Sequence, residues 1–232
     1  MKTLPTQERA LIKRQALVDA AISEFSSIGF EVATAKSIAA VADVATGTFY
    51  QYFDNKNEIL RVIASARFDG LHQRIRLLEL KAVNDSKPEM AATGLSARTG
   101  AWLDVEGQFA DTLMFVYEFH AGDPALHQVL EQRRALDPKL QAIMDQGEQV
   151  LRTRVLRFVN NFNISNAELV AENLFAMAEG LVHRLVFHST SHNSTERGRK
   201  EALEIGAKML ASYFIQNQVK TNLRPQHNSG TK

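Results

Sequence analysis

TAKSIAAVADVATGTFYQYF, residues 34–53, is the stretch of sequence that decides the fold. Thr34 has the short hydroxyl side chain that often caps a helix N-terminus, so a short helix is expected over residues 35–42. A second short helix is expected over residues 45–52. Asp43 lies in the tight connection between them. Glycine is usual at such a turn because it favours a positive φ, and aspartate is one of the few other residues that tolerate this conformation.

The apolar residues of this stretch are spaced for two helices that cross at about 90–120°, as in a helix-turn-helix. A small residue, Ala39, lets the two backbones approach each other. The residues expected to face the crossing are Ile38, Ala42, Val44, Phe49 and Tyr52. Phe49 and Phe53 are predicted to be core residues, whereas a core position and a DNA phosphate contact both stay open for Tyr52.

The other side chains of the second short helix are short or form hydrogen bonds, which suits a helix that reads base edges. Gln51 has the groups for a bidentate contact to adenine, and Gly47 would let the backbone approach DNA closely. Lys36 and Lys56, at the starts of the neighbouring helices, would lie near the DNA backbone. The helix itself contributes Thr46, Gly47, Thr48, Tyr50, Gln51 and Tyr52 as candidate DNA contacts.

Charge gives this interpretation no support. The chain of 232 residues has a formal net charge of +1, and residues 1–60 contain six Lys or Arg against seven Asp or Glu. Any affinity for DNA must therefore come from where the cations lie. Arg9, Lys13 and Arg14 either steer DNA or form a solvated helix face, and both interpretations stay open.

Two runs of sequence resemble the N-terminal domain of TetR family regulators. The first contains Ala20-Ala21-Ile22, Phe25, Gly29-Phe30, Thr34 and Ile38-Ala39, and the second runs from Val44 through Gly47-Thr48-Phe49-Tyr50, Tyr52-Phe53 and Asn55-Lys56 to Glu58. The resemblance covers about residues 12–62, and Asp43 departs from the family's usual glycine. It implies a sequence-specific DNA-binding regulator, with a double-stranded DNA operator as partner. It also implies that Thr34, Lys36, Thr46, Gly47, Thr48, Tyr50, Gln51, Tyr52 and Lys56 lie at or near DNA.

The rest of the chain has a helical apolar period, which predicts an all-α fold of about nine helices. A first helix is expected over residues 9–28, ending at Gly29, and a long helix over 56–83, capped at Asn55. Further helices are expected from residue 88 onward, the first near 88–104 and the last two over 166–189 and 195–217. The predicted domains are a helix-turn-helix domain (1–60), a larger helical ligand-binding and dimerisation domain (61–219) and a disordered polar tail (220–232).

By the same resemblance, the larger domain would bind a regulatory ligand and form a homodimer. The last two helices have apolar stripes suited to a four-helix interface, although such stripes also form ordinary intrachain core. The residues expected in the dimer interface are Leu174, Met177, Leu181, Leu185, Met209 and Tyr213.

A small-molecule pocket is predicted where aromatic residues cluster with a few polar ones. The residues expected to line it are Trp102, Phe109, Met114, Tyr117, His120, Phe175, Glu179 and His183. The alternative is that these aromatics form core. The lack of concentrated charge favours a hydrophobic or amphipathic effector, and a regulator without a ligand, controlled by its abundance or by a protein partner, is the alternative function.

The sequence carries no pattern of an enzyme, a metal site or a cofactor site. It has no glycine-rich phosphate loop, no nucleophile elbow and no zinc-type spacing. The pair Glu179 and His183 is expected to be structural rather than an acid and base. There are no cysteines, no run of 18 apolar residues and no apolar signal segment, so a cytoplasmic protein without a membrane span is expected.

Overall fold

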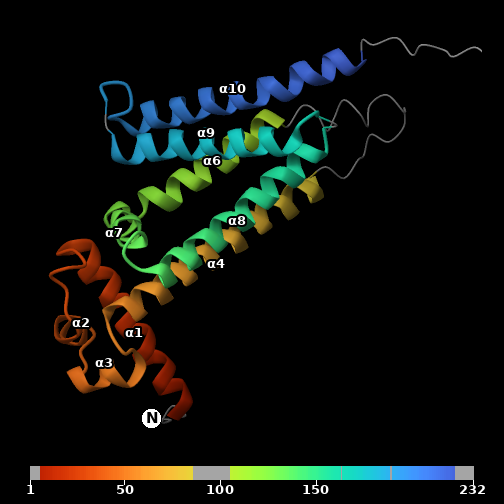
Figure 1. Ribbon diagram of the computed structural model, residues 1–232. Coiled ribbons are helices and arrows are strands. Elements are labelled where there is room, and N and C mark those ends of the chain that lie inside the picture. The colour runs from red at the N-terminus through yellow and green to blue at the C-terminus, as the bar shows by residue number, and fades with distance from the viewer. Residues whose placement is uncertain (1–5, 86–104, 163, 189, 223–232) are drawn as a thin grey trace, which may run out of the picture. The chain divides into compact units, whose positions relative to one another are not determined.

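The structure describes residues 6–85, 105–162, 164–188 and 190–222, and these form α-helices joined by turns and loops. The structure is a computed structural model (Figure 1). The all-α prediction is confirmed. The helices are α1 (Thr6–Ser27), α2 (Ala35–Val41), α3 (Thr46–Tyr52), α4 (Lys56–Asp85), α6 (Val105–Ala121), α7 (Pro124–Arg134), α8 (Pro138–Asn160), α9 (Ala167–Phe187) and α10 (Glu196–Asn222).

Two of the segments predicted from the sequence, a helix and the tail, extend beyond the residues that the structure describes. The helix predicted near 88–104 lies outside them, as does most of the predicted tail. Helix α10 continues to Asn222, so the first residues of the predicted tail are helical. Within the described residues, no helix is long and apolar enough to cross a membrane.

The described residues form two compact units, and the chain passes between them more than once. The first unit contains the chain up to Gln73 together with Ala121–Val150, and the second contains the described parts of Arg74–His120 and of Leu151 onward. Helices α4 and α8 therefore each contribute residues to both units. The first unit is larger than the predicted domain of residues 1–60, because α7 and the first half of α8 pack with α1–α4 in one core.

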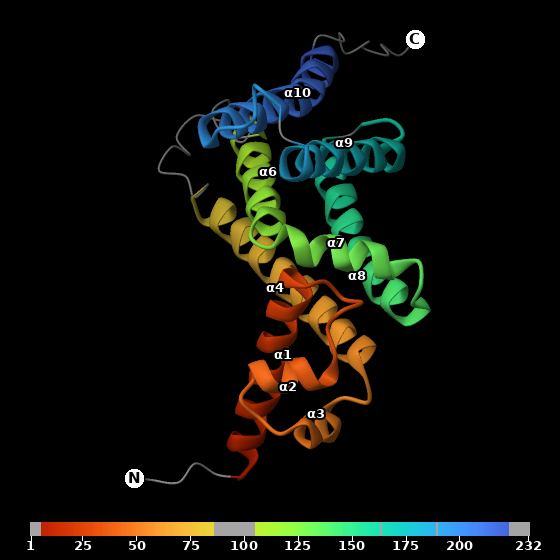
Figure 2. The same cartoon turned by 90° about the vertical axis from the view of Figure 1, so that its left-hand side faces the viewer.

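The core of the first unit is built from apolar residues of six helices. In Figure 2, α2 lies beside α1, with α3 next to it. Helices α4 and α8 approach closely where Gly147 of α8 faces Phe68 of α4, and a Cβ atom on Gly147 would lie 2.3 Å from two ring carbons of Phe68. His72 Nε2 lies 3.0 Å from the carbonyl oxygen of Gly147. The most deeply buried large side chains here are Leu17, Phe25, Ile38, Phe49, Ile59, Leu60, Ile63, Leu126 and Leu140.

The second unit has its own core, formed by α6, α9, α10 and the C-terminal half of α8. A group of phenylalanine rings lies within it. The Phe214 ring centroid is 5.7 Å from that of Phe109, 5.4 Å from Phe158 and 4.7 Å from Phe162. Such tilted ring pairs contribute beyond their buried area. This packing holds α6, α8 and α10 together inside the second unit.

Candidate nucleic-acid interface

The start of α2 is fixed by the cap that the sequence predicts. The backbone N–H of Ser37 donates to Thr34 Oγ1 at 3.0 Å, and the N–H of Thr34 donates to Ser37 Oγ at 3.0 Å. Each side-chain oxygen thus accepts a hydrogen bond from the backbone N–H of the other residue. Neither of these N–H groups has an acceptor within the helix. The N-cap prediction for Thr34 is confirmed, and it places Lys36 in the exposed first turn of α2.

The turn between α2 and α3 depends on the backbone conformation of one residue. Asp43 has a φ of 53°, the left-handed conformation that non-glycine residues seldom adopt. Next to it, the N–H of Val44 donates to the carbonyl of Ala39 at 3.0 Å. The prediction that Asp43 takes the place of the usual turn glycine is confirmed.

Helix α3 has a buried side and an exposed side. Phe49 is fully buried and Phe53 is 2% exposed, which confirms both as core residues. Tyr50, in contrast, is 59% exposed and contacts the Phe49 ring edge-on. A Cβ atom on Gly47 would meet no atom within 4 Å, so the protein's own packing does not require glycine there.

Eight of the nine predicted DNA contacts lie at the start of α2 or on α3 and keep exposed surface. Thr34, Lys36, Thr46, Gly47 and Gln51 are exposed, like Tyr50, while Thr48 and Tyr52 are half-buried. Tyr52 packs against the core with one part and borders a shallow hollow beside α1 with another. We call this surface the reading face; it consists of Thr34, Lys36, Thr46, Gly47, Thr48, Tyr50, Gln51 and Tyr52.

Lys56 has a structural role that the sequence does not predict. Its ammonium donates to the carbonyl oxygens of Phe30, Glu31 and Ala33 at 2.7, 3.1 and 3.2 Å. A lysine ammonium has three N–H donors, and all three are directed at the connection between α1 and α2. A phosphate contact by Lys56 would compete with these hydrogen bonds, so we leave Lys56 out of the reading face, and its contact with DNA stays a prediction.

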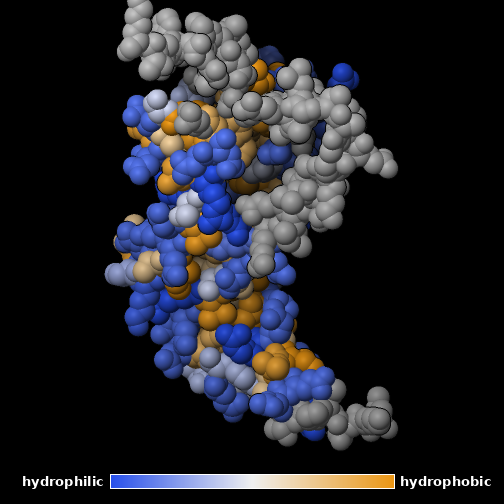
Figure 3. Space-filling model, turned by 90° about the vertical axis from the view of Figure 1, so that its right-hand side faces the viewer, coloured by the Kyte–Doolittle hydropathy of each residue, from blue (hydrophilic) through white to orange (hydrophobic). Residues whose placement is uncertain are grey.

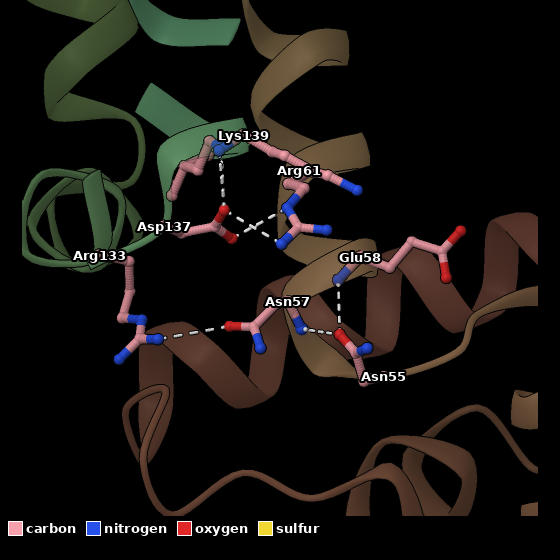
Figure 4. Close-up of polar contacts among 8 residues, drawn as sticks. Asn55, Asn57, Glu58, Arg61, Arg133, Asp137 and Lys139 are labelled. Atoms are coloured by element: carbon pink, nitrogen blue, oxygen red, sulfur yellow. Dashed lines mark hydrogen bonds and ion pairs between the residues drawn. The ribbon is translucent and has the colours of Figure 1, made fainter. Parts of the chain in front are cut away.

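A second group of polar contacts holds the start of α4 and the start of α8 (Figure 4). Asn55 Oδ1 accepts from the N–H groups of Asn57 and Glu58 at 3.0 and 3.1 Å, which confirms the predicted cap. Arg61 binds the Asp137 carboxylate with two hydrogen bonds, from Nε at 2.9 Å and Nη2 at 3.0 Å. Sequence patterns did not identify the Arg61–Asp137 pair, although the Asp-Pro step at residues 137–138 is typical of a helix start.

The electrostatics of Asp137 follow from its position beneath the first turn of α8. Burial alone would raise the pKa of the carboxyl group. The hydrogen bond from Arg61, those from the backbone N–H groups of Leu140 and Lys139, and the positive charge of Arg61 outweigh burial and lower the pKa of Asp137 below its ordinary value. Asp137 is therefore an anion that caps α8 and binds it to α4.

The seven described residues that are predicted to line a ligand pocket all belong to the second unit, and they differ in burial. Trp102 lies outside the described part of the chain, and Phe109 is packed among the phenylalanine rings of the second unit. The ring of Phe175 lies under the Arg152 guanidinium, with 4.2 Å between its centroid and Cζ. Met114, Tyr117 and His120 are half-buried, whereas Glu179 and His183 are exposed on α9.

The residues predicted for a dimer interface divide into two groups. Leu174 and Leu185 are each 7% exposed and belong to the core of the second unit, where Leu181 also packs. This buried position leaves Leu174 and Leu185 little surface to offer a second subunit. Met177 of α9, and Met209 and Tyr213 of α10, are 55%, 64% and 43% exposed. Leu169 of α9 and Ile205 of α10 are also more than half exposed, so both helices present large apolar side chains that the rest of the described residues does not cover.

The first unit also exposes apolar side chains. Leu11 and Ile12 of α1 are 66% and 52% exposed, and Leu11 borders the shallow hollow beside Tyr52, which has a volume of about 480 Å³. Figure 3 shows apolar patches of this kind among the hydrophilic side chains of one face. None of the residues predicted to line a ligand pocket borders this hollow.

Comparison with known proteins agrees with this geometry. The family model for bacterial regulatory proteins of the tetR family matches residues 17–63, which contain the whole helix-turn-helix. A curated relative, the HTH-type transcriptional regulator BetI of Serratia proteamaculans, is 26% identical over 187 residues, covering 80% of this chain and 86% of that protein. This relative and the matched family are transcriptional regulators and not enzymes.

Solved structures share the fold over most of the chain. A transcriptional regulator from Rhodococcus superposes with a TM-score of 0.60 at 18% identity, covering 88% of this chain and 96% of that one. The fatty acid degradation regulator FadR from Bacillus halodurans has a TM-score of 0.58 at 17% identity, covering 91% and 97%. The chain is therefore similar to TetR family transcriptional regulators, in sequence across its helix-turn-helix and in fold over most of its length.

Proposed function

We propose that the protein is a homodimeric repressor that binds a palindromic operator through the reading face and is released by a small hydrophobic or amphipathic effector. The observation that carries the DNA-binding part is the two-sided helix α3, with Phe49 buried and Tyr50 and Gln51 exposed. Hydrogen-bonding side chains on an exposed recognition helix are suited to base edges and phosphates. In a dimer, two such helices enter successive major grooves about 34–36 Å apart.

The dimer part of the proposal is supported by the uncovered apolar surface on α9 and α10. Two-fold symmetry would bring the same surface of each subunit together and bury Met177, Met209 and Tyr213. We expect Met209→Glu to convert the dimer to a monomer in light scattering. The matched control is Leu136→Glu, which places the same charge at a residue of the first unit that is 67% exposed. A dimer of unchanged stability in Met209→Glu would contradict this interface.

The release step is supported by the path of α4. This helix follows directly on the helix-turn-helix and contributes residues to both compact units, so a ligand that shifts it would change the spacing of the two recognition helices. The affinity for the operator would fall by the coupling free energy, which is typically about 1–3 kcal/mol. Release of bound DNA by apolar small molecules, measured by fluorescence anisotropy, tests this part.

A regulator without a ligand is the second candidate. Phe109, which was expected to line the pocket, packs in the core of the second unit, with its ring centroid 5.4 Å from that of Phe158. Packing of this kind favours control by protein abundance or by a protein partner. A panel of apolar molecules that neither releases DNA nor raises the melting temperature would favour this candidate.

Selection of bound duplexes from random-sequence DNA tests the DNA-binding part and supplies the operator. On a selected duplex, Tyr50→Ala should weaken binding, and Lys36→Ala should also lower the slope of log affinity against log salt by about one unit. Lys200→Ala, which removes an exposed lysine from α10, is the charge-matched control. Failure of the wild-type protein to enrich any duplex would refute the proposed function.

A further inference from the structure

Arg133, in the last turn of α7, reaches the helix-turn-helix from outside it. Its Nη1 pairs with Glu31 Oε1 at 2.9 Å, and its Nη2 donates to Asn57 Oδ1 at 3.4 Å (Figure 4 shows the second contact). The guanidinium carbon also lies 4.6 Å from the centroid of the Phe30 ring. One side chain of α7 therefore contacts both the connection between α1 and α2 and the first turn of α4.

The connection that Arg133 contacts is the segment that places α2. Phe30 and Glu31 lie between Gly29, where the backbone turns with a φ of 84°, and Thr34, the N-cap of α2. Lys56 holds the same segment from α4 through its three carbonyl hydrogen bonds, with Nζ 4.5 Å from the Phe30 ring centroid. Two cations, one from α4 and one from α7, thus hold the short segment that leads into the reading face.

The arginine at position 133 carries one cost to stability. The side chain is 18% exposed, and its Nε is buried without a hydrogen-bond partner among the described residues. A buried donor that makes no hydrogen bond lowers stability. A methionine of similar length would fill this space over Phe30 without leaving a donor unsatisfied, but it would bind neither Glu31 nor Asn57. These two groups indicate what the arginine does beyond packing.

We infer that Arg133 is a positioning residue for DNA binding. It touches no DNA itself, and it acts by holding the α1–α2 connection, and with it α2 and α3, at a fixed place against α4 and α7. The inference rests on the proposed DNA-binding role of the reading face. The inference also means that α7 influences the affinity for the operator. A displacement of α7 would move Glu31, and with it the segment before Thr34.

The neighbouring residue provides a matched control. Arg134 lies at the same end of α7, but its partners are Glu131 of α7 and Asp145 and Glu148 of α8. Arg133→Met and Arg134→Met each remove one positive charge from the same turn, so any long-range effect of charge on DNA affinity is the same in both. Only Arg133→Met removes a contact with the α1–α2 connection, and the contacts of Lys56 remain in both variants.

The experiment measures the affinity of full-length variants for a duplex that the wild-type protein selects from random-sequence DNA, with the active fraction determined by stoichiometric titration. We expect Arg133→Met to bind about tenfold more weakly than wild type, and Arg134→Met to bind like wild type even if its melting temperature is lower. The salt slope of Arg133→Met should equal that of wild type, because no phosphate contact is lost. Equal affinities of the two variants would overturn the inference. A salt slope lowered by about one unit would overturn it too, because that result would place Arg133 on a phosphate.

A second variant keeps the test valid if Arg133→Met does not fold. The Glu31 side chain is 76% exposed, so Glu31→Gln removes the partner of Arg133 without disturbing the core. Loss of a negative charge should strengthen DNA binding on electrostatic grounds, and the control Glu8→Gln should show this or no change. We expect Glu31→Gln to bind more weakly than wild type, opposite to the charge effect, and tighter or unchanged binding would overturn the inference. If the wild-type protein selects no duplex, the proposed function fails, and this inference falls with it.

Discussion

Replacement of Asp137 tests how far one carboxylate holds α4 and α8 together. In the folded chain it accepts two hydrogen bonds from Arg61 and two from the backbone N–H groups of Lys139 and Leu140, at 2.9–3.2 Å. The Asp137 side chain is 6% exposed and that of Arg61 26%, so water replaces little of what is lost. Asp137→Asn keeps an oxygen for the helix cap and loses the charge. Asp137→Ala loses both the cap and the charge.

The two variants separate the ion pair from the cap. Hydrogen bonds between charged groups contribute about 1.5–3 kcal/mol, so Asp137→Asn should lower the free energy of unfolding by about 2 kcal/mol. Loss of an N-cap costs about 1 kcal/mol more, so Asp137→Ala should lower it by about 3 kcal/mol. The measurement is urea denaturation at a fixed protein concentration, followed by far-UV circular dichroism. A double-mutant cycle with Arg61→Met should give a coupling energy of about 2 kcal/mol.

The pH dependence of this stability has a definite sign. The pKa of Asp137 is lowered on folding, so its contribution is present above the unfolded pKa of about 3.9 and is lost as the pH falls through the lower, folded value. The difference between wild type and Asp137→Asn should be constant from about pH 7 to about pH 5 and should shrink below about pH 4. Equal destabilisation by both variants, or a difference that is the same at every pH, would refute this account of Asp137.

Three further substitutions test the backbone and the packing. Gly47→Ala should raise the free energy of unfolding by up to about 1 kcal/mol, because nothing in the protein opposes a Cβ there. The same variant should bind a selected duplex more weakly, and unchanged affinity would show that DNA does not approach this glycine. Asp43→Ala should be less stable than Asp43→Gly by about 1 kcal/mol in thermal unfolding, because φ at this position is 53°. Gly147→Ala should lower stability by about 1–2 kcal/mol, since the clash with Phe68 exceeds the gain in helix propensity, and Phe68→Leu in the same chain should restore part of the loss.

The helix-turn-helix could be predicted from sequence because its signals are local. The cap at Thr34 involves Ser37, and the turn at Asp43 involves residues only a few positions away. Helix α1 ends just before Gly29, whose positive φ suits glycine. Interactions of this range leave a pattern that can be recognised in one sequence. The buried side of α3 was predictable for the same reason, since helical spacing places Phe49 and Phe53 on one side.

The contacts that hold the first unit together left no such pattern. Arg61 and Asp137 are 76 residues apart in sequence, and Arg133 and Glu31 are 102 apart. A single cation or carboxylate on a helix is usually solvated, and only the packing of α7 against α1 and of α8 against α4 gives these residues partners. The apolar residues of α9 likewise did not show from sequence which of them are buried. Leu174 and Met177 are both apolar, yet one packs in the core and the other is exposed, because the helix has apolar residues on two sides.

The structure also changes how much the basic residues are expected to contribute to DNA binding. Residues 1–60 contain six basic residues, and at least two of them make contacts within the protein. The ammonium of Lys56 binds three carbonyls, and the Arg14 guanidinium lies 5.3 Å from the centroid of the Phe53 ring. A net attraction to phosphate is therefore a small part of what the first unit offers to DNA. We therefore expect recognition to depend on hydrogen-bonding groups held at the correct place, and the contacts of Lys56 and Arg133 with the α1–α2 connection hold the segment that leads into α2.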